Sequence, residues 1–250
     1  PGLRPFLQTE AELFFGRADQ IKRMLERLEE NRFLAVVGSS GSGKSSLVRA
    51  GLLPVLGQGY LLDAGTDWNF VVMRPGSDPF GNLAQEFHQT VTDDTTGYDT
   101  SDVAFTKAAL QTSPRGFLEV VEEAGLDKRV PLLLLIDQFE ETFRFRRRHA
   151  VGGPAGEGDR AVHKERNDAS AFVNLLLTTA DIAAKAELPI YVVITMRSDF
   201  IGDCDVFPGL PQAISASQFL VPRLTRRQMQ DVIAKPPLPF APRPDPVQLT

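Results

Sequence analysis

Apolar positions follow two different periods along this chain, one typical of helices and one of buried strands. Ile21, Met24, Leu25 and Leu28 recur every three to four residues, which predicts an amphipathic helix over residues 18–30. Short continuous apolar runs predict buried strands instead. The strands predicted from these runs are Arg32–Val37, Phe70–Met73, Pro131–Ile136, Ile190–Thr195 and Gln218–Val221.

Helices are predicted between these strands. One should run from Lys44 to about Leu53, where Pro54 disfavours continuation. Asp78 and Pro79 are typical of a helix start, and that helix should reach His88. The other predicted helices cover residues 116–123, 168–185 and 225–234, and residues 138–148 should form a helix or a helical turn. Polar loops are expected at 92–101 and 151–159, and a proline-rich tail from 236 onward. Such alternation predicts an α/β fold with a mostly parallel sheet covered by helices on both faces.

Composition narrows the class of protein. The chain has 250 residues, of which 42% are hydrophobic and 24% charged, as in ordinary globular proteins. A net charge of −5 argues against broad nucleic-acid binding, and no apolar run is long enough to span a membrane. Cys204 is the single cysteine, so no internal disulfide can form, and we expect a cytoplasmic location. The first residue is Pro, so we expect a piece of a longer protein.

The strongest motif is a phosphate-binding loop between the first strand and the helix after it. Its residues are Gly38-Ser39-Ser40-Gly41-Ser42-Gly43-Lys44-Ser45, followed by Ser46. Glycines let successive amide groups turn toward phosphate oxygens, and the helix adds the positive end of its dipole. Lys44 should reach the β- and γ-phosphates, and the Ser45 hydroxyl should ligate magnesium. A flexible serine–glycine turn is the simpler alternative, but it does not require this position between strand and helix.

A second motif follows the apolar run that ends at Ile136. Asp137 should lie at the carboxyl edge of the sheet, where it can serve as a second ligand for magnesium. Glu140 or Glu141 could polarise a water for attack on the γ-phosphate. Alternatively, both glutamates only place favourable charge in the first turn of a helix.

A third motif ends the strand Ile190–Thr195. Arg197 could report whether ATP or ADP is bound, or it could form an ordinary ion pair with Asp199. The basic run Arg144–His149 fits a helix C-terminus better than a phosphate or nucleic-acid site. The three histidines show no metal-ligand spacing, so magnesium with ATP or ADP is the only cofactor expected.

Taken together, these motifs resemble the novel STAND ATPases, which are relatives of the apoptotic, NACHT and plant-resistance switch ATPases. The resemblance rests on motifs spread in order over nearly the whole chain. They are Pro1–Phe6, Phe14–Arg17, the phosphate loop, Asp137–Glu141, Met196–Phe200 and Val221–Thr225. It implies a five-stranded P-loop core, here a three-layer α/β/α sandwich, with Phe15, Gly16 and Arg17 near the adenine and Glu141 or Glu140 in hydrolysis. It also implies that Pro236 contacts the base.

The resemblance further implies an organisation and a role. We expect a nucleotide-flanking segment at 1–17, the NTPase core at 18–224 and the start of a helical lid or linker at 225–250. In such proteins ADP holds a closed state, and ATP exchange permits assembly with other domains of the same long chain or with further copies. The expected function is a slow ATPase that acts as a conformational switch.

Other functions compete with this one. A kinase that transfers phosphate to a small acceptor is possible, although no acceptor pocket can be identified. The guanine motif of GTPases and the Leu-Ser-Gly-Gly-Gln segment of transporter ATPases are both absent from the sequence. A scaffold that binds ADP and hardly turns over is the non-enzymatic alternative.

Overall fold

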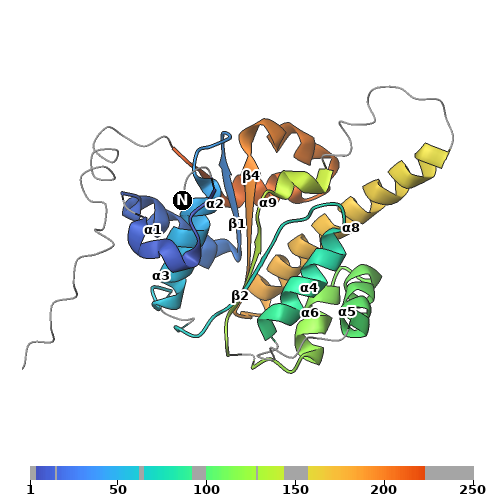
Figure 1. Ribbon diagram of the computed structural model, residues 1–250, viewed down its shortest axis with the longest axis horizontal. Coiled ribbons are helices and arrows are strands. Elements are labelled where there is room, and N and C mark those ends of the chain that lie inside the picture. Colours follow the sequence, from blue (N-terminus) through green and yellow to red (C-terminus); the bar gives the residue numbers. More distant parts are fainter. Residues whose placement is uncertain are drawn as a thin grey trace, which may run out of the picture.

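The computed structural model describes residues 4–14, 16–61, 65–91, 100–127, 129–143 and 157–222, with backbone only for 12, 13 and 157–165. A central sheet separates two helical layers (Figure 1). All five strands are parallel and lie in the order β2-β3-β4-β1-β5. Their bounds are β1 Phe33–Gly38, β2 Asn69–Met73, β3 Leu132–Ile136, β4 Ile190–Arg197 and β5 Gln218–Leu220. The predicted three-layer P-loop fold with a five-stranded sheet is confirmed.

The order of the strands determines what meets at the carboxyl edge of the sheet. Strand β4 lies between β1, which leads into the phosphate loop, and β3, which leads to Asp137. Gly38 of β1 is in register with Arg197 of β4, and Ile136 of β3 is in register with Ile194. Thr195 therefore lies between the phosphate loop and the acidic strand, at the switch point where such folds bind ligands.

One face of the sheet is covered by the N-terminal helices. These are η1 (Gln8–Leu13), α1 (Ala18–Asn31), α2 (Lys44–Ser46), η2 (Leu47–Leu52) and α3 (Leu53–Gly57). Met24 and Leu28 of α1 pack with Leu34 and Val36 of β1, and all four are fully buried. The amphipathic helix predicted over residues 18–30 is therefore present as α1, and its apolar side packs on the sheet.

The other face carries the larger helical layer. It contains α4 (Pro79–Val91), α5 (Thr100–Thr112), α6 (Gly116–Glu123), α8 (Glu157–Lys185) and α9 (Leu210–Ser217). Alternate residues of β1, such as Ala35 and Val37, point to this side. Phe80 of α4 meets Phe172 of α8 edge to face, with ring centroids 5.4 Å apart. Because both faces are covered, every residue of β1 and β3 is buried.

Pro54 does not end the helix that follows the phosphate loop, which contradicts our expectation. The helix continues to Gly57, and its middle segment, η2, is a π-helix. The ring of a proline clashes with the carbonyl four residues earlier in a regular α-helix. The wider π turn before Pro54 moves that carbonyl away, so the chain can stay helical past the proline.

Other boundaries also differ from the sequence-based expectation. The sequence analysis missed α5, α9 and two short 3-10 segments, η1 and η4 (Ser198–Val206). The segment after Asp137 is a 3-10 helix, η3 (Phe139–Phe143), and residues 144–148 of the expected helix lie outside the described residues. Helix α8 begins at Glu157, so the end of the expected loop at 151–159 is helical. Residues 92–99 of the loop predicted at 92–101 and the segment after 222 lie outside the described residues, whereas residues 100 and 101 of that loop belong to helix α5.

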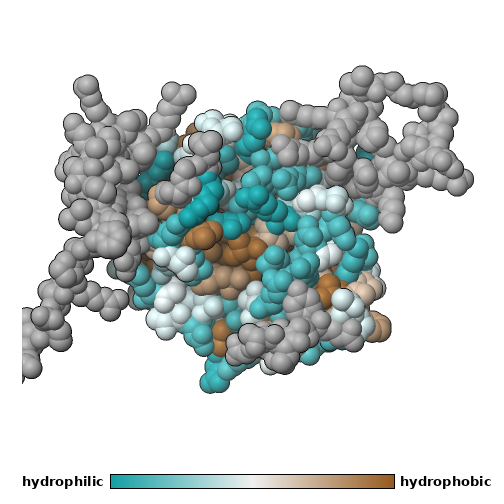
Figure 2. Space-filling model, in the orientation of Figure 1, coloured by the Kyte–Doolittle hydropathy of each residue, from teal (hydrophilic) through white to brown (hydrophobic). Residues whose placement is uncertain are grey.

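Strand β2 forms one edge of the sheet and contributes apolar surface. Phe70 and Val72 are only partly buried, and the Trp68 ring stacks on Phe70 with centroids 5.8 Å apart. Figure 2 shows an apolar area in the middle of the view, where Figure 1 draws this strand.

No described helix is long and apolar enough to cross a membrane.

Candidate functional site

The phosphate loop has the backbone that its glycines predict. Gly41 and Gly43 have positive φ angles of 72° and 85°, which L-residues with side chains rarely adopt. Gly38 has a different constraint, because a Cβ there would lie 2.7 Å from Ser42 Oγ and 3.3 Å from Val221 Cβ. The loop therefore folds back tightly on the end of β1 and turns into helix α2.

Lys44 closes this loop from inside. Its Nζ donates hydrogen bonds to the carbonyl oxygens of Gly38 at 2.9 Å and Ser39 at 2.8 Å. Burial lowers the pKa of the Lys44 amino group, and the nearby Glu140 carboxylate opposes this shift. The cation therefore stands at the base of the loop, in reach of a phosphate group held by the loop amides.

Ser45 and Asp137, separated by 92 residues, meet at the carboxyl edge of the sheet. Ser45 Oγ donates to Asp137 Oδ1 at 2.6 Å, and Thr195 Oγ1 donates to the same oxygen at 2.7 Å. The Thr195 hydroxyl also accepts from the Gln138 N–H at 3.0 Å. Because Ser45 uses its proton on Asp137, the lone pairs of its oxygen remain available for a cation.

This donor set fits magnesium. Mg²⁺ takes oxygen ligands, commonly one or two from the protein with the rest from phosphates and water. The described residues contain no group of three or more His, Cys, Asp or Glu that could hold a metal by themselves. A serine hydroxyl and one buried carboxylate beside a phosphate loop agree with a metal that arrives with its nucleotide.

The second carboxylate oxygen of Asp137 faces two arginines. Arg49 Nη2 lies 3.0 Å from Oδ2 and Arg74 Nε lies 3.8 Å from it. Neither contact has hydrogen-bond geometry, so Oδ2 of this fully buried residue has no hydrogen-bond donor within the described part of the chain. The contacts are ion pairs that balance a buried negative charge.

Glu140 and Glu141 point in different directions. Glu140 is 4% exposed, and its Oε2 accepts from the backbone N–H of Arg197 at 3.4 Å. Glu141 instead accepts from the N–H of Gly76, in the segment after β2, at 3.3 Å. Both residues belong to the 3-10 helix η3, in which successive side chains point about a third of a turn apart, and the left-handed backbone of Gln138, with a φ of 60°, sets how that helix leaves Asp137. Glu140 faces the phosphate loop and Glu141 faces β2.

The side chain of Arg197 is paired with Asp199. The guanidinium makes two hydrogen bonds to that carboxylate, at 3.0 Å and 2.7 Å, and lies over the Phe200 ring. This bidentate pair raises the pKa of Arg197. The ordinary ion pair considered from the sequence is therefore present, and Arg197 also lines the same cavity as Lys44.

Arg17 ties the N-terminal segment to the phosphate loop. It is 7% exposed and donates to the Ser42 carbonyl at 3.2 Å, the Pro222 carbonyl at 3.4 Å and Gln20 Oε1 at 2.7 Å. Burial lowers the pKa of this guanidinium, and its hydrogen-bond partners among the described residues are all neutral. Gly16 has a φ of 80°, and Phe15 lies outside the described residues.

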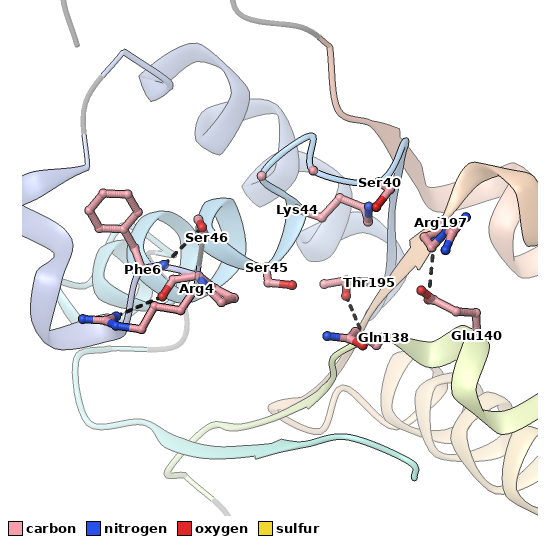
Figure 3. Close-up of a pocket in the computed structure, with 13 residues that line it drawn as sticks. Arg4, Phe6, Ser40, Lys44, Ser45, Ser46, Gln138, Glu140, Thr195 and Arg197 are labelled. Atoms are coloured by element: carbon pink, nitrogen blue, oxygen red, sulfur yellow. Dashed lines mark hydrogen bonds between the residues drawn. The ribbon is translucent and has the colours of Figure 1, made fainter. Parts of the chain in front are cut away.

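A cavity of about 570 Å³ opens between these groups (Figure 3). Figure 3 shows Lys44 and Ser45 on one side and Gln138, Glu140, Thr195 and Arg197 on the other. Arg4 and Phe6 close the far end, where the Phe6 N–H donates to Ser46 Oγ at 3.1 Å. Arg4 is held by two hydrogen bonds to Glu10, at 2.7 Å and 2.6 Å.

The geometry brings together most of the residues proposed from the sequence. The cavity is lined by Ser40, Gly41, Gly43, Lys44, Ser45, Ser46, Glu140 and Arg197. Gly38, Ser39 and Ser42 shape the loop without lining the cavity, Asp137 lies behind Ser45, and Glu141 points away. Pro236 lies outside the described residues. The roles of these residues stay predictions.

Four contributors to the site were given no role in the sequence analysis. Thr195 ends the strand beside the acidic one, and Gln138 follows Asp137 directly. Arg49 comes four residues after Ser45, so helical spacing alone places it on the same face as the expected magnesium ligand. Arg4 lies in the Pro1–Phe6 motif and the expected nucleotide-flanking segment, but its side chain was given no role, because only the fold shows that it lines the cavity.

Similar folds occur among solved structures. A chain in the E. coli MS115-1 HORMA:CdnC:Trip13 complex matches with a TM-score of 0.51 and 15% identity, over 92% of this chain and 71% of that chain. The Aeropyrum pernix ORC2 protein, in complexes with ADPNP and ADP, matches with a TM-score of 0.45 and 12% identity, over 94% of this chain and 52% of that chain. At 15% identity the first likeness concerns the fold alone, and nothing is concluded from the second, whose TM-score is below 0.5.

The sequence gives a more specific answer. The search of curated proteins found no match. A family model described as Novel STAND NTPase 1 matches residues 1–240 and so takes in every motif described above, from the N-terminal segment to the strand β5. This chain therefore belongs to the novel STAND NTPases, as its motifs predict.

Proposed function

We propose that this chain binds ATP and ADP with magnesium and hydrolyses ATP slowly, as the switch module of a longer signalling or defence protein. The observation that supports this best is the 2.6 Å hydrogen bond between Ser45 and Asp137. It joins the phosphate loop to the acidic strand at one point, beside a cavity that Lys44, Glu140 and Arg197 also line. Cytoplasmic location and nucleotide-dependent self-assembly belong to the same proposal.

Each of these residues would have a separate role in hydrolysis. Lys44 would exchange its two loop carbonyls for phosphate oxygens and stabilise the charge that develops on them. Ser45 and Asp137 would hold magnesium, which neutralises phosphate charge when bound. Glu140 would orient a water and take its proton as the water oxygen bonds to the γ-phosphorus and the bond to the β-phosphate oxygen breaks. The products are ADP and phosphate.

Arg197 would link the nucleotide to the conformation of the chain. Its backbone N–H holds Glu140, while its guanidinium is held by Asp199. To reach a γ-phosphate the guanidinium must leave Asp199, and that movement would differ between ATP and ADP. A cation already engaged in two hydrogen bonds fits a slow ATPase better than a fast one.

Binding is tested by the melting temperature of the purified chain with Mg-ATP and Mg-ADP. At about 100 times the dissociation constant, a ligand that binds only the folded state adds about 2.7 kcal/mol of stability. Lys44→Ala should remove most of that gain, whereas Lys185→Ala, on the exposed end of α8, should keep it. Absence of any shift in the unaltered chain would refute nucleotide binding.

Hydrolysis is tested by phosphate release over many turnovers, with two neighbouring substitutions as a matched pair. We expect Glu140→Gln to lower the rate at least about 100-fold, as loss of a general base does. Glu141→Gln should retain most of it, because this side chain points to Gly76. Transfer to an added small acceptor would favour the kinase, and binding without turnover would favour the ADP-bound scaffold.

A further inference from the structure

Arg49 is the less exposed of the two arginines that face Asp137 Oδ2. It lies in the π-helix η2, four residues after Ser45, and its Nη2 is 3.0 Å from Asp137 Oδ2. The side chain is 22% exposed, and its Nε is buried without a hydrogen-bond partner in the described part of the chain. Arg74 approaches the same oxygen only to 3.8 Å and is 47% exposed. Arg49 is therefore the main counter-charge of Asp137.

This position conflicts with a divalent cation. A magnesium ion at Ser45 and Asp137 would lie close to the Arg49 guanidinium, in surroundings where water screens little. Asp137 is fully buried, so its charge always needs a compensating cation. Before magnesium binds, Arg49 supplies this positive charge. With both cations present, the positive charge beside Asp137 would exceed the single negative charge of its carboxylate.

A second carboxylate lies within reach of Arg49. A cavity of about 410 Å³ is lined by Arg49, Arg74, Asn82 and Glu86, among others. Glu86 is on α4, and within the described residues its carboxylate makes no hydrogen bond or ion pair. Burial raises the pKa of Glu86, while the charge of Arg49 opposes the shift. Glu86 is therefore a half-buried carboxylate that lines the same cavity as Arg49 but forms no ion pair with it.

We propose that Arg49 is a built-in substitute for the metal, which neutralises Asp137 in the nucleotide-free chain and moves to Glu86 when magnesium enters with the nucleotide. This inference rests on the proposed function, because it takes Ser45 and Asp137 as the metal site. It makes metal binding dependent on the phosphates, since the ion alone must displace Arg49. It also couples the metal site to helix α4.

The test measures metal binding directly. Mn²⁺ titrated without nucleotide and followed by its electron spin resonance signal should bind the unaltered chain weakly. Removal of the competing charge in Arg49→Met should tighten Mn²⁺ binding about tenfold or more. If Arg49 has only a structural role, Arg49→Met lowers the melting temperature and leaves the Mn²⁺ dissociation constant unchanged, which would overturn the proposal.

Glu86→Gln carries the test even if Arg49→Met does not fold, because it alters a half-exposed helix position. Without the alternative partner, Arg49 should stay at Asp137, and the Mg²⁺ concentration for half-maximal stabilisation by ADP should rise about threefold. Glu123→Gln, an exposed change on α6, is the matched control and should have no effect. If Glu86→Gln behaves like Glu123→Gln, Arg49 does not move to Glu86.

Two further measurements separate the possible failures. In the Arg49→Met background, Glu86→Gln should no longer change the Mg²⁺ requirement, because the two residues act as a pair. A persistent effect there would overturn the coupling. If ADP with Mg²⁺ fails to stabilise even the unaltered chain, the proposed function fails, whereas the Mn²⁺ comparison involves no nucleotide and tests Arg49 by itself.

Discussion

At the scale of single residues, the site is organised around one buried carboxylate. Asp137 Oδ1 receives two hydroxyl groups, from Ser45 and Thr195, and Oδ2 faces Arg49. Each of these partners comes from a different element, so the carboxylate is fixed from several directions. A rigid, desolvated ligand is what a metal site with few protein ligands needs.

The left-handed backbone at Gln138 is the clearest local strain beside this carboxylate. A residue with a side chain at a φ of 60° costs about 1–2 kcal/mol that glycine avoids. Both Gln138→Gly and Gln138→Ala remove the side chain, so their difference isolates the backbone. We expect the glycine variant to be about 1 kcal/mol more stable than the alanine variant in urea unfolding. Equal midpoints would show that the turn relaxes at no cost.

At the scale of elements, close backbone contacts decide how the second helical layer packs. A Cβ at Gly116, the first residue of α6, would lie 2.9 Å from Leu110 Cα in α5 and closer still to the Ala109 carbonyl. Backbone cannot move aside as a side chain can, so Gly116→Ala should destabilise the chain by about 1–3 kcal/mol. Gly57 in α3 has nothing within 4 Å of such a Cβ.

Gly57→Ala is therefore the matched control and should be neutral or stabilising by up to about 1 kcal/mol, because alanine favours a helix. Both variants are compared by the free energy of unfolding in urea. Our account of the α5–α6 contact would fail if Gly116→Ala unfolded at the same urea concentration as Gly57→Ala.

The same scale shows what the sequence can and cannot predict. The five strands were predictable because runs such as Leu132–Ile136 are buried on both faces and leave no alternative to a central sheet. Helix α5 was missed because its apolar side is narrow, with Leu110 as its single buried residue among those described. The continuation past Pro54 was missed because it depends on a π turn, which no local pattern announces. The periodicity of apolar residues indicates which side of a helix is buried, but it does not show whether the helix can continue past a proline.

The site follows the same division. The phosphate loop, the acidic strand and the arginine strand were found because each motif is continuous in sequence. Which glutamate faces the cavity depends on the left-handed turn at Gln138, a conformation that the residue type does not suggest. Arg4 lines the cavity only because the N-terminal segment is held there by the long-range contact between Phe6 and Ser46. Such contacts arise only from the assembled fold.

At the scale of the whole molecule, the sheet makes one edge the meeting point of distant segments. The loop at 38–46 and the segment at 137–141 come from strands separated by β4, and the hydrogen bond from Ser45 to Asp137 joins them beside Thr195 of β4. The opposite edge of the sheet has a different cavity, between α6 and the end of α8, lined by residues such as Leu118, Leu126 and Ile182. A nucleotide bound at the first edge should leave the second unaffected.

Amide hydrogen exchange can test this separation across the molecule. With saturating Mg-ADP we expect exchange to slow by about tenfold or more in residues 38–46 and 137–141, because binding stabilises the closed state of both segments together. In residues 118–126 and 182–190 the exchange rate should slow only as far as the higher global free energy of unfolding of the bound chain explains. Lys44→Ala should remove the effect at both segments, although the second lies some 90 residues away in sequence. Protection confined to 38–46 would mean that the nucleotide engages the loop without the acidic strand, and the magnesium role of Asp137 would then have to be abandoned.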